Sequence, residues 1–308
     1  MRLCKPSFEI LDQQCGLEGI YKQIEVVGRT CYKSEDKITE DSAKGFVDRM
    51  IKSGHGAMLE HGTVYLKMPT GKYSFLDVDY FDDCDDIKNS FFSNPYTRIH
   101  CQEGYYYIST NYRVLVENFS EEFISELLQY LCEPTEYHKK RICVRFICDR
   151  GVSHEFVRHR VFSFAQESTR YCNYSKDKFD NEITYICPCW LDYNKVQELT
   201  EIANKDNKEV YRMGHDESLS MEERGLCSFV YDMSNHEHGY LFQISAGWKP
   251  QEARAVLPNA LKTELVMTGF ASDWEHFFEL RDAVSAHPQA QELVHPLHEA
   301  FIQRGLVK

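Results

Sequence analysis

Apolar side chains recur at helical spacing in three separate stretches, and we predict a helix in each. The first stretch follows Asp41-Ser42 and ends at Ser53-Gly54, the second follows Ser120 as its N-cap, and the third begins near Pro288. Their apolar positions are Ala43, Phe46, Val47, Met50 and Ile51; Phe123, Ile124, Leu127, Leu128 and Leu131; and Leu293, Leu297 and Phe301.

Four other runs are rich in β-branched and aromatic residues, which favour strands. They are residues 64–68, which Pro69 ends, 105–108, 114–116 and 142–148, the last as a buried strand. The C-terminal third is predicted to be mostly helical. Pro250 suits the first turn of a helix, and Ser272 with Glu275 fits a capping box ahead of Phe277.

Strands in the first half with helices before, between and after them predict an α+β or mixed α/β fold, not a regular βαβ alternation. We expect a mixed or antiparallel sheet flanked by helices. No linker of Pro, Gly and Ser divides the chain, so residues 1–308 are predicted to form one domain. Residues 72–140 read as an inserted subdomain, with a solvated loop at the aspartate-rich residues 79–86.

Charge and hydropathy narrow the function classes. The 308 residues contain 48 acidic and 35 basic side chains, a net charge of −13, which argues against a general nucleic-acid binder. No apolar run reaches the ~20 residues that span a bilayer, so no membrane partner is expected. The first six residues lack an apolar signal segment, and the expected location is the cytoplasm.

The chain contains 12 cysteines, and in a reducing cytosol these are expected to be free thiols. Zinc is the alternative at Cys187-Pro188-Cys189, but a structural zinc site needs four closely spaced ligands and no second pair is present. His55 and His61 flank Glu60 in a pattern that differs from the zinc-protease motif, so structural roles are favoured there too. We predict no metal site.

The densest chemical signal lies in residues 155–171, where Arg158, Arg160 and Arg170 stand among apolar residues. Guanidinium groups in such surroundings need partners. One interpretation is a specific anion pocket, typical of phosphate or of a flat polar ring. The other is a set of internal ion pairs with Glu155, Glu167 and Asp149, and spacing alone does not decide between them. When each is considered alone, Arg254 and Arg281 are predicted to be surface arginines.

Dinucleotide, Walker A, nucleophile-elbow and zinc-protease motifs are absent from the sequence. Ser168 therefore has no context for activation as a nucleophile, and its hydroxyl is expected to form hydrogen bonds.

Arg158-His159-Arg160, seven residues and then Ser168 resemble the R-H-R-x7-S signature of the flavin-dependent thymidylate synthases. Three further segments resemble that family in the family's order. They are Gly54-His55-Gly56 with Glu60-His61, Ala253-Arg254-Ala255-Val256-Leu257-Pro258, and Phe277-Phe278-Glu279-Leu280-Arg281 followed by His287-Pro288-Gln289. Together the four segments extend over roughly half of the chain.

The resemblance implies a homotetramer with FAD-binding active sites formed between chains. It implies reductive methylation of dUMP to dTMP, with 5,10-methylenetetrahydrofolate as the one-carbon donor and NADPH as the reductant of the flavin. No protein cysteine need attack the uracil, which agrees with cysteines that show no activated context.

The resemblance also implies site residues. Arg281 would be catalytic and would stabilise negative charge on the uracil. The implied dUMP-binding residues are Glu155, Arg158, Gln166, Glu167, Ser168, Arg170, Arg254 and Arg281. The implied FAD-binding residues are His55, Ala57, Arg158, His159, Arg160, Gln166, His276 and His287.

Glu155 departs from the family pattern, which often has Gln at this position. A carboxylate near a phosphate repels it unless the carboxylate is protonated or paired with arginine. Two other functions remain open. One is a nucleotide- or flavin-binding protein without methyl transfer, which would not need both Arg281 and Ser168. The other is an RNA-modifying flavin methyltransferase, which the net charge of −13 disfavours.

Overall fold

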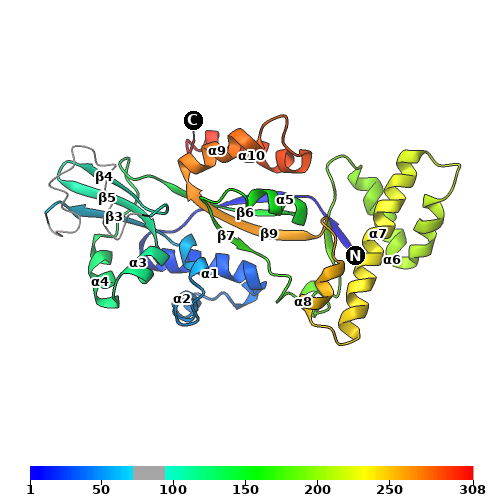
Figure 1. The fold of residues 1–308 in the computed structure, drawn as a ribbon, viewed down its shortest axis with the longest axis horizontal. Helices are drawn as coiled ribbons and strands as arrows, with labels where there is room; N and C mark the ends of the chain where they lie inside the picture. Colours follow the sequence, from blue (N-terminus) through cyan, green and yellow to red (C-terminus); the bar gives the residue numbers. More distant parts are fainter. Residues whose placement is uncertain (72–93, 308) are drawn as a thin grey trace.

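The structure is a computed structural model that describes residues 1–71 and 94–307. It is elongated, with a small sheet at one end, a central sheet in the middle and a pair of long helices at the other end (Figure 1). The mixed α/β class with antiparallel sheets, predicted from the sequence, is confirmed.

The central sheet has the strand order β2 (Ser7–Leu11), β6 (Arg141–Asp149), β9 (Lys262–Phe270), β7 (Ser163–Gln166), and every pairing is antiparallel. Alternate side chains of β6 face opposite sides. Val144 and Phe146 pack with α9 (Ala271–Arg281) and α10 (Pro288–Gln303), while Cys143 packs with α1 (Gly16–Tyr32). Helices therefore cover both faces (Figure 1).

The small sheet has the order β3 (Thr63–Pro69), β5 (Tyr105–Asn111), β4 (Arg98–Gln102) and is also antiparallel. It packs with α1 and with shorter helices into a second core. These are α2 (Ser42–Lys52), the 3-10 turn η2 (Gly56–His61), α3 (Tyr112–Asn118), α4 (Glu121–Leu127) and the 3-10 turn η3 (Leu128–Tyr130).

The third part is built on β1 (Arg2–Cys4), which pairs in parallel with β8 (Thr184–Ile186). The long helices α6 (Tyr193–Gly214) and α7 (Met221–Ser245) pack on each other there. The N-terminal amino group reaches Glu237 of α7 over 2.8 Å. The remaining elements are η1 (Glu35–Lys37), α5 (Arg150–Phe156), η4 (Asp177–Phe179), α8 (Pro250–Ala253) and η5 (Arg254–Val256).

Most predicted elements are confirmed: the helices at 42–52 and 288–303, the strands at 64–68, 105–108 and 142–148, and Pro250 in a first helical turn. Ser120 caps α4 by accepting a hydrogen bond from the Phe123 N–H at 3.3 Å. That helix gives way to a 3-10 turn at Leu128, so Leu131 lies beyond it.

Two local predictions are wrong. Residues 114–116 belong to helix α3, not to a strand, because the Asn111 side chain accepts from the Val114 N–H and starts a helix there. Ser272 does not cap α9. That helix begins at Ala271, and Asp273 accepts from the Phe270 N–H at 3.0 Å.

The predicted acidic loop at 79–86 lies outside the described residues. The single domain and the 72–140 insertion stay predictions. Within residues 1–71 and 94–307, no helix is long and apolar enough to cross a membrane. The eleven cysteines in this part are all free, and no group of metal-ligating side chains is found there.

Candidate functional site

Arg281, at the C-terminal end of α9, is tied to helix α5 and the segment that follows it. Its Nε donates to Nε2 of His159 at 3.0 Å, its Nη1 donates to a Glu155 carboxylate oxygen at 2.6 Å, and its Nη2 donates to the Glu155 carbonyl at 3.0 Å. These bonds use three of the five guanidinium N–H groups, and the other two have no partner among the described residues. Arg281 is only one-fifth exposed, so its orientation is well defined.

His159 is buried against the ring of Phe277, with the ring centres 4.9 Å apart. Burial, reinforced by the charge of Arg281, lowers the pKa of His159 to about 4. The imidazole is therefore neutral near pH 7, and its Nε2 is free to accept from Arg281. The neighbouring His276 is exposed, contacts Glu279 at 3.1 Å and has its ring centre 6.5 Å from that of His159.

Arg254 belongs to a second group of predicted site residues, beside the turn that follows β7. Its Nη1 donates to the hydroxyl of the buried Thr169 at 3.2 Å. A cavity of about 300 Å³ opens there, and Arg150 and His154 of α5 line it together with Arg254. Two arginines and a histidine around one hollow suit an anion. Arg150 and His154 were not among the predicted site residues, although both come just before the arginine-rich segment 155–171.

Ser168 occupies the same turn and joins it to helix α1. Its backbone N–H donates to the Cys31 carbonyl at 3.0 Å, and its hydroxyl accepts from the Arg170 N–H at 3.3 Å. The guanidinium of Arg170 lies 5.5 Å from the Tyr171 ring centre and is otherwise exposed. Ser168 thus sits in a hydrogen-bonded turn, as expected, with no base beside its hydroxyl within the described residues.

The N-terminal motif reaches this turn through two tyrosines. The ring centres of Tyr171 and Tyr32 are 5.5 Å apart, and the Tyr32 hydroxyl lies 3.1 Å from His55 Nδ1. His55 is exposed, as is Ala57 on η2. The structure therefore brings the motif at 54–61 close to the segment that follows the motif at 158–168, although residues 62–157 separate the two motifs in the sequence.

Gln166 and Glu167 form internal bonds. Gln166 Nε2 donates to the hydroxyls of Ser153 and Thr263 at 2.9 and 3.2 Å. Glu167 is buried and accepts from Lys262 at 3.0 Å and from the Tyr174 hydroxyl at 3.1 Å. The sequence left open that Glu155 and Glu167 pair with Arg158, Arg160 or Arg170, but Glu155 pairs with Arg281 and Glu167 with Lys262. Asp149 instead caps α5, accepting from the Val152 N–H at 2.7 Å.

Arg158 and Arg160 lie at the surface, and the anion-pocket interpretation stays a prediction for them. Both are exposed, and neither guanidinium has a hydrogen-bonding partner in the described part of the chain. Free guanidiniums of this kind fit a diphosphate, such as that of a dinucleotide. His287 lies apart from them, with its ring centre 6.0 Å from that of Trp190.

The predicted residues thus gather in two neighbouring places. One contains Arg281, Glu155, His159 and His276, and the other contains Arg254, Ser168, Arg170 and His55. Helix α5 and strand β7 connect them. This arrangement defines a mixed α/β protein with an arginine-rich surface suited to anionic ligands.

The sequence of residues 105–304 matches the Thy1 family, described as thymidylate synthase complementing protein. The chain belongs to this family, as the motifs predicted. The matched region contains the motifs at 158–168, 253–258 and 277–289, while the motif at 54–61 precedes it.

Curated relatives agree with this assignment. A flavin-dependent thymidylate synthase of Pyrococcus furiosus is 25% identical over 192 residues, which are 62% of this chain and 66% of the relative. One from Corynebacterium efficiens is 33% identical over 133 residues, 43% of this chain and 45% of the relative. The chain spans about half to two thirds of the length of the curated relatives it matches.

Among solved structures, the chain is similar to a UMP/dUMP methylase, PolB from Streptomyces cacaoi, bound with 5-Br dUMP. The two are 16% identical with a TM-score of 0.39, and the comparison covers 100% of this chain and 93% of the other.

Proposed function

We propose that this protein is a flavin-dependent thymidylate synthase, which converts dUMP to dTMP with 5,10-methylenetetrahydrofolate, FAD and NADPH. Membership of the Thy1 family supports this proposal. The observation that carries it is the fixed guanidinium of Arg281, which keeps two N–H groups free beside a neutral histidine.

Each group of residues would then have a task. Arg281 would donate to the uracil ring and stabilise the charge that develops on it, an effect that often contributes more to catalysis than any other. Arg254, Arg170 and the Ser168 hydroxyl would hold the phosphate and sugar of dUMP, with Arg150 and His154 adding positive charge to the same cavity. The sequence-implied contacts of Gln166 and Glu167 would be indirect, since both side chains bond within the protein.

FAD fits the exposed side of this surface. The guanidiniums of Arg158 and Arg160, which have no partner among the described residues, suit its diphosphate, and His55, Ala57 and His276 are also exposed. When bound, FAD supplies the hydride and takes part in carrying the one-carbon unit, while the protein orients both substrates. His159 would act by holding Arg281, while the ring of His287 contacts that of Trp190.

A homotetramer would complete the site. Arg170, Arg254 and His276 are exposed to solvent in the single chain. A neighbouring subunit would exclude that water and strengthen the electrostatic interactions. Sedimentation of the purified protein tests this step: a tetramer supports it, and a monomer at micromolar concentration contradicts it.

The enzyme proposal is tested by product analysis. The purified chain is supplied with FAD, NADPH, methylenetetrahydrofolate and dUMP, and nucleotides are separated by chromatography. We expect dTMP only in the complete mixture, with no product when FAD or folate is omitted. A protein that binds FAD and dUMP but makes no dTMP would instead be a binding protein. The Glu155 carboxylate on Arg281 is the feature that favours this second function.

A further inference from the structure

Asp282 directly follows Arg281 in the chain, and both oxygens of its carboxylate are bonded to helix α10. Nδ1 of His295 lies 2.9 Å from one oxygen, and Nδ1 of His298 lies 2.8 Å from the other. An ionised carboxylate only accepts hydrogen bonds, so each histidine carries a hydrogen on Nδ1 and donates it. The Asp282 side chain is only 15% exposed, and the contact is therefore largely shielded from water.

His298 is the firmer of the two partners. Its ring stacks on that of Phe278 with the ring centres 4.3 Å apart, and Phe278 is buried in the core that α9 and α10 share. Packing therefore fixes the His298 ring in addition to its bond with Asp282. His295 is more exposed and also lies 3.7 Å from Glu299, so its contact with Asp282 is weaker.

Helix α10 also contacts the backbone at the end of α9. Nε2 of Gln291 donates to the carbonyl oxygens of Asp282 and Ala283, at 3.3 and 3.4 Å. The last carbonyls of a helix have no partner within the helix and must find one elsewhere. The end of α9 is thus attached to α10 through both the backbone and the side chain of Asp282.

An aspartate is an unfavourable residue at this position of a helix. The C-terminal end of a helix carries a partial negative charge, so an acidic side chain is destabilising there and a basic one is favoured. Asp282 is the C-cap of α9, and the helix alone therefore gives no reason for a carboxylate. Residues that break a local rule tend to lie at functional sites, and the neighbouring Arg281 gives Asp282 such a context.

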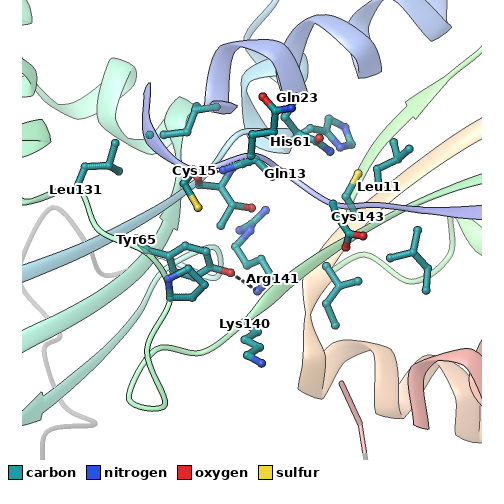
Figure 2. Close-up of a pocket in the computed structure, with 18 of the residues that line it drawn as sticks. Leu11, Gln13, Cys15, Gln23, His61, Tyr65, Leu131, Lys140, Arg141 and Cys143 are labelled. Atoms are coloured by element: carbon teal, nitrogen blue, oxygen red, sulfur yellow. Dashed lines mark hydrogen bonds between the residues drawn. The ribbon is translucent and has the colours of Figure 1, made fainter. Parts of the chain in front are cut away.

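An arginine in the central sheet shows why Arg281 needs this attachment. Arg141 lies on β6, where it is paired with Phe270 of β9, and its backbone N–H donates to the Tyr65 hydroxyl at 2.9 Å (Figure 2). A neighbouring strand thus holds the backbone of Arg141 in place. Arg281 is the last residue of a helix, and helix ends fray unless another element holds them.

The same helix α10 also holds a partner of Arg281. Gln289 donates to the Asp149 carboxylate at 2.7 Å, and Asp149 is the N-cap of α5, which carries Glu155. Helix α10 therefore contacts the start of α5 and the end of α9, the two helices that the bond between Arg281 and Glu155 joins. A misplacement of ~1 Å can lower a rate ~100-fold, so this attachment matters for a guanidinium that acts through its position.

We propose that Asp282 is a positioning residue for Arg281, a role that rests on the proposed thymidylate synthase function. By accepting from His295 and His298, Asp282 fixes the end of α9, so that the Arg281 guanidinium keeps its bonds to His159 and Glu155. Asp282 itself touches no substrate, because both of its carboxylate oxygens are engaged by α10.

Substitutions at Asp282 test this role through the rate of dTMP formation. Asp282→Ala should lower kcat roughly tenfold and change the KM for dUMP less than about twofold, because Arg281 acts on the charge of the transition state. Asp282→Asn should restore most of the rate, since the amide oxygen accepts from one histidine and the amide NH2 donates to the other in its second tautomer. Added to Arg281→Ala, Asp282→Ala should cause no further loss, because both changes remove the same interaction.

His298→Phe tests the same contact from the other helix. The phenyl ring keeps the stack on Phe278 but cannot donate to Asp282, so kcat should fall several-fold in a protein whose circular dichroism is unchanged. His215→Phe is the matched control at the end of α6. The His215 ring centre lies 4.2 Å from that of Tyr211, and its Nδ1 lies 2.8 Å from the Tyr211 carbonyl oxygen. This control variant should keep the full rate.

An unchanged kcat in Asp282→Ala or in His298→Phe, or a full additional loss when Asp282→Ala is combined with Arg281→Ala, would overturn the proposal. If no dTMP forms at all, the proposed function fails, and crystal structures of the unchanged protein and of Asp282→Ala still test the positioning. The 3.0 Å distance from Arg281 Nε to His159 Nε2 should exceed about 3.5 Å in the variant, beyond hydrogen-bonding range. A retained bond would overturn the role of Asp282.

Discussion

The guanidinium of Arg281 donates from Nε to Nε2 of His159 over 3.0 Å, across 122 positions of sequence. This bond requires an unprotonated Nε2, and the lowered pKa of His159 supplies it throughout the neutral range. Arg281 is consequently held by a neutral acceptor on one side and by Glu155 on the other. Changes to these contacts, and to the ion pairs around β9, should therefore alter activity and stability in measurable ways.

Replacing Arg281 by Ala should lower kcat by about a hundredfold or more, the loss seen when an oxyanion donor is removed. Steady-state rates of dTMP formation measure the effect. Arg304→Ala is the control, because Arg304 is a surface residue paired with Asp12, and it should keep its rate. An unchanged kcat in the Arg281 variant would remove this residue from catalysis.

Glu155→Gln should lower the KM for dUMP several-fold. The amide still accepts from Arg281, but it neither neutralises the guanidinium nor repels a phosphate. Glu198→Gln, the same change at an exposed position of α6, should have no effect. A raised KM in Glu155→Gln would mean that the carboxylate itself is needed to orient Arg281.

Ser168→Ala should weaken dUMP binding without abolishing turnover, since one hydrogen-bonding hydroxyl contributes ~1 kcal/mol. The hydroxyl accepts from the Arg170 N–H, so part of the loss would come from a looser turn. Ser245→Ala, at an exposed helix end, serves as the control. Complete inactivity at saturating dUMP would indicate nucleophilic catalysis by Ser168 and contradict its role as a hydrogen-bonding group.

Lys262→Met should reduce the free energy of unfolding by about 3 kcal/mol, because it leaves Glu167 buried without its cation. Burial acts to raise the pKa of Glu264, yet Lys262 and Lys33 outweigh it and lower the value to about 2, so this carboxylate also depends on the lysine. Urea denaturation measures the change. Lys44→Met, which breaks an exposed pair with Asp48, should cost well under 1 kcal/mol.

Stability should fall as the pH is lowered from about 6.5 to about 4. The pKa of His159 is about 4 in the folded chain against an ordinary value of 6.5, so in this window the unfolded chain binds more protons. The slope is up to about 1.4 kcal/mol per pH unit for each such histidine, and His61 adds to it. His159→Gln should flatten the dependence in urea titrations. Equal slopes in the unchanged protein and in this variant would contradict the lowered pKa.

Local patterns predicted much of the fold. The apolar stripe at 43–51 and the run at 142–148 became α2 and β6, because burial of those faces determines both elements. The pattern failed at 114–116, where strand-forming valines were overruled by the Asn111 cap. No strand was predicted at β9, although β9 lies between β6 and β7 in the central sheet and pairs with both.

Sequence motifs predicted the residues of the candidate site, but they did not predict which side chains pair with one another. Spacing could not show that Glu155 would pair with Arg281, or Glu167 with Lys262, because partners 126 and 95 positions away meet only in the folded chain.

The most direct test of the central claim is release of tritium from dUMP labelled at C5. The purified protein is mixed with FAD, NADPH, methylenetetrahydrofolate and the labelled nucleotide, and tritium in water is counted against dTMP formed. A flavin-dependent thymidylate synthase should release tritium together with dTMP, and Arg281→Ala should suppress both. A folded protein that binds FAD and releases no tritium would contradict the proposed activity.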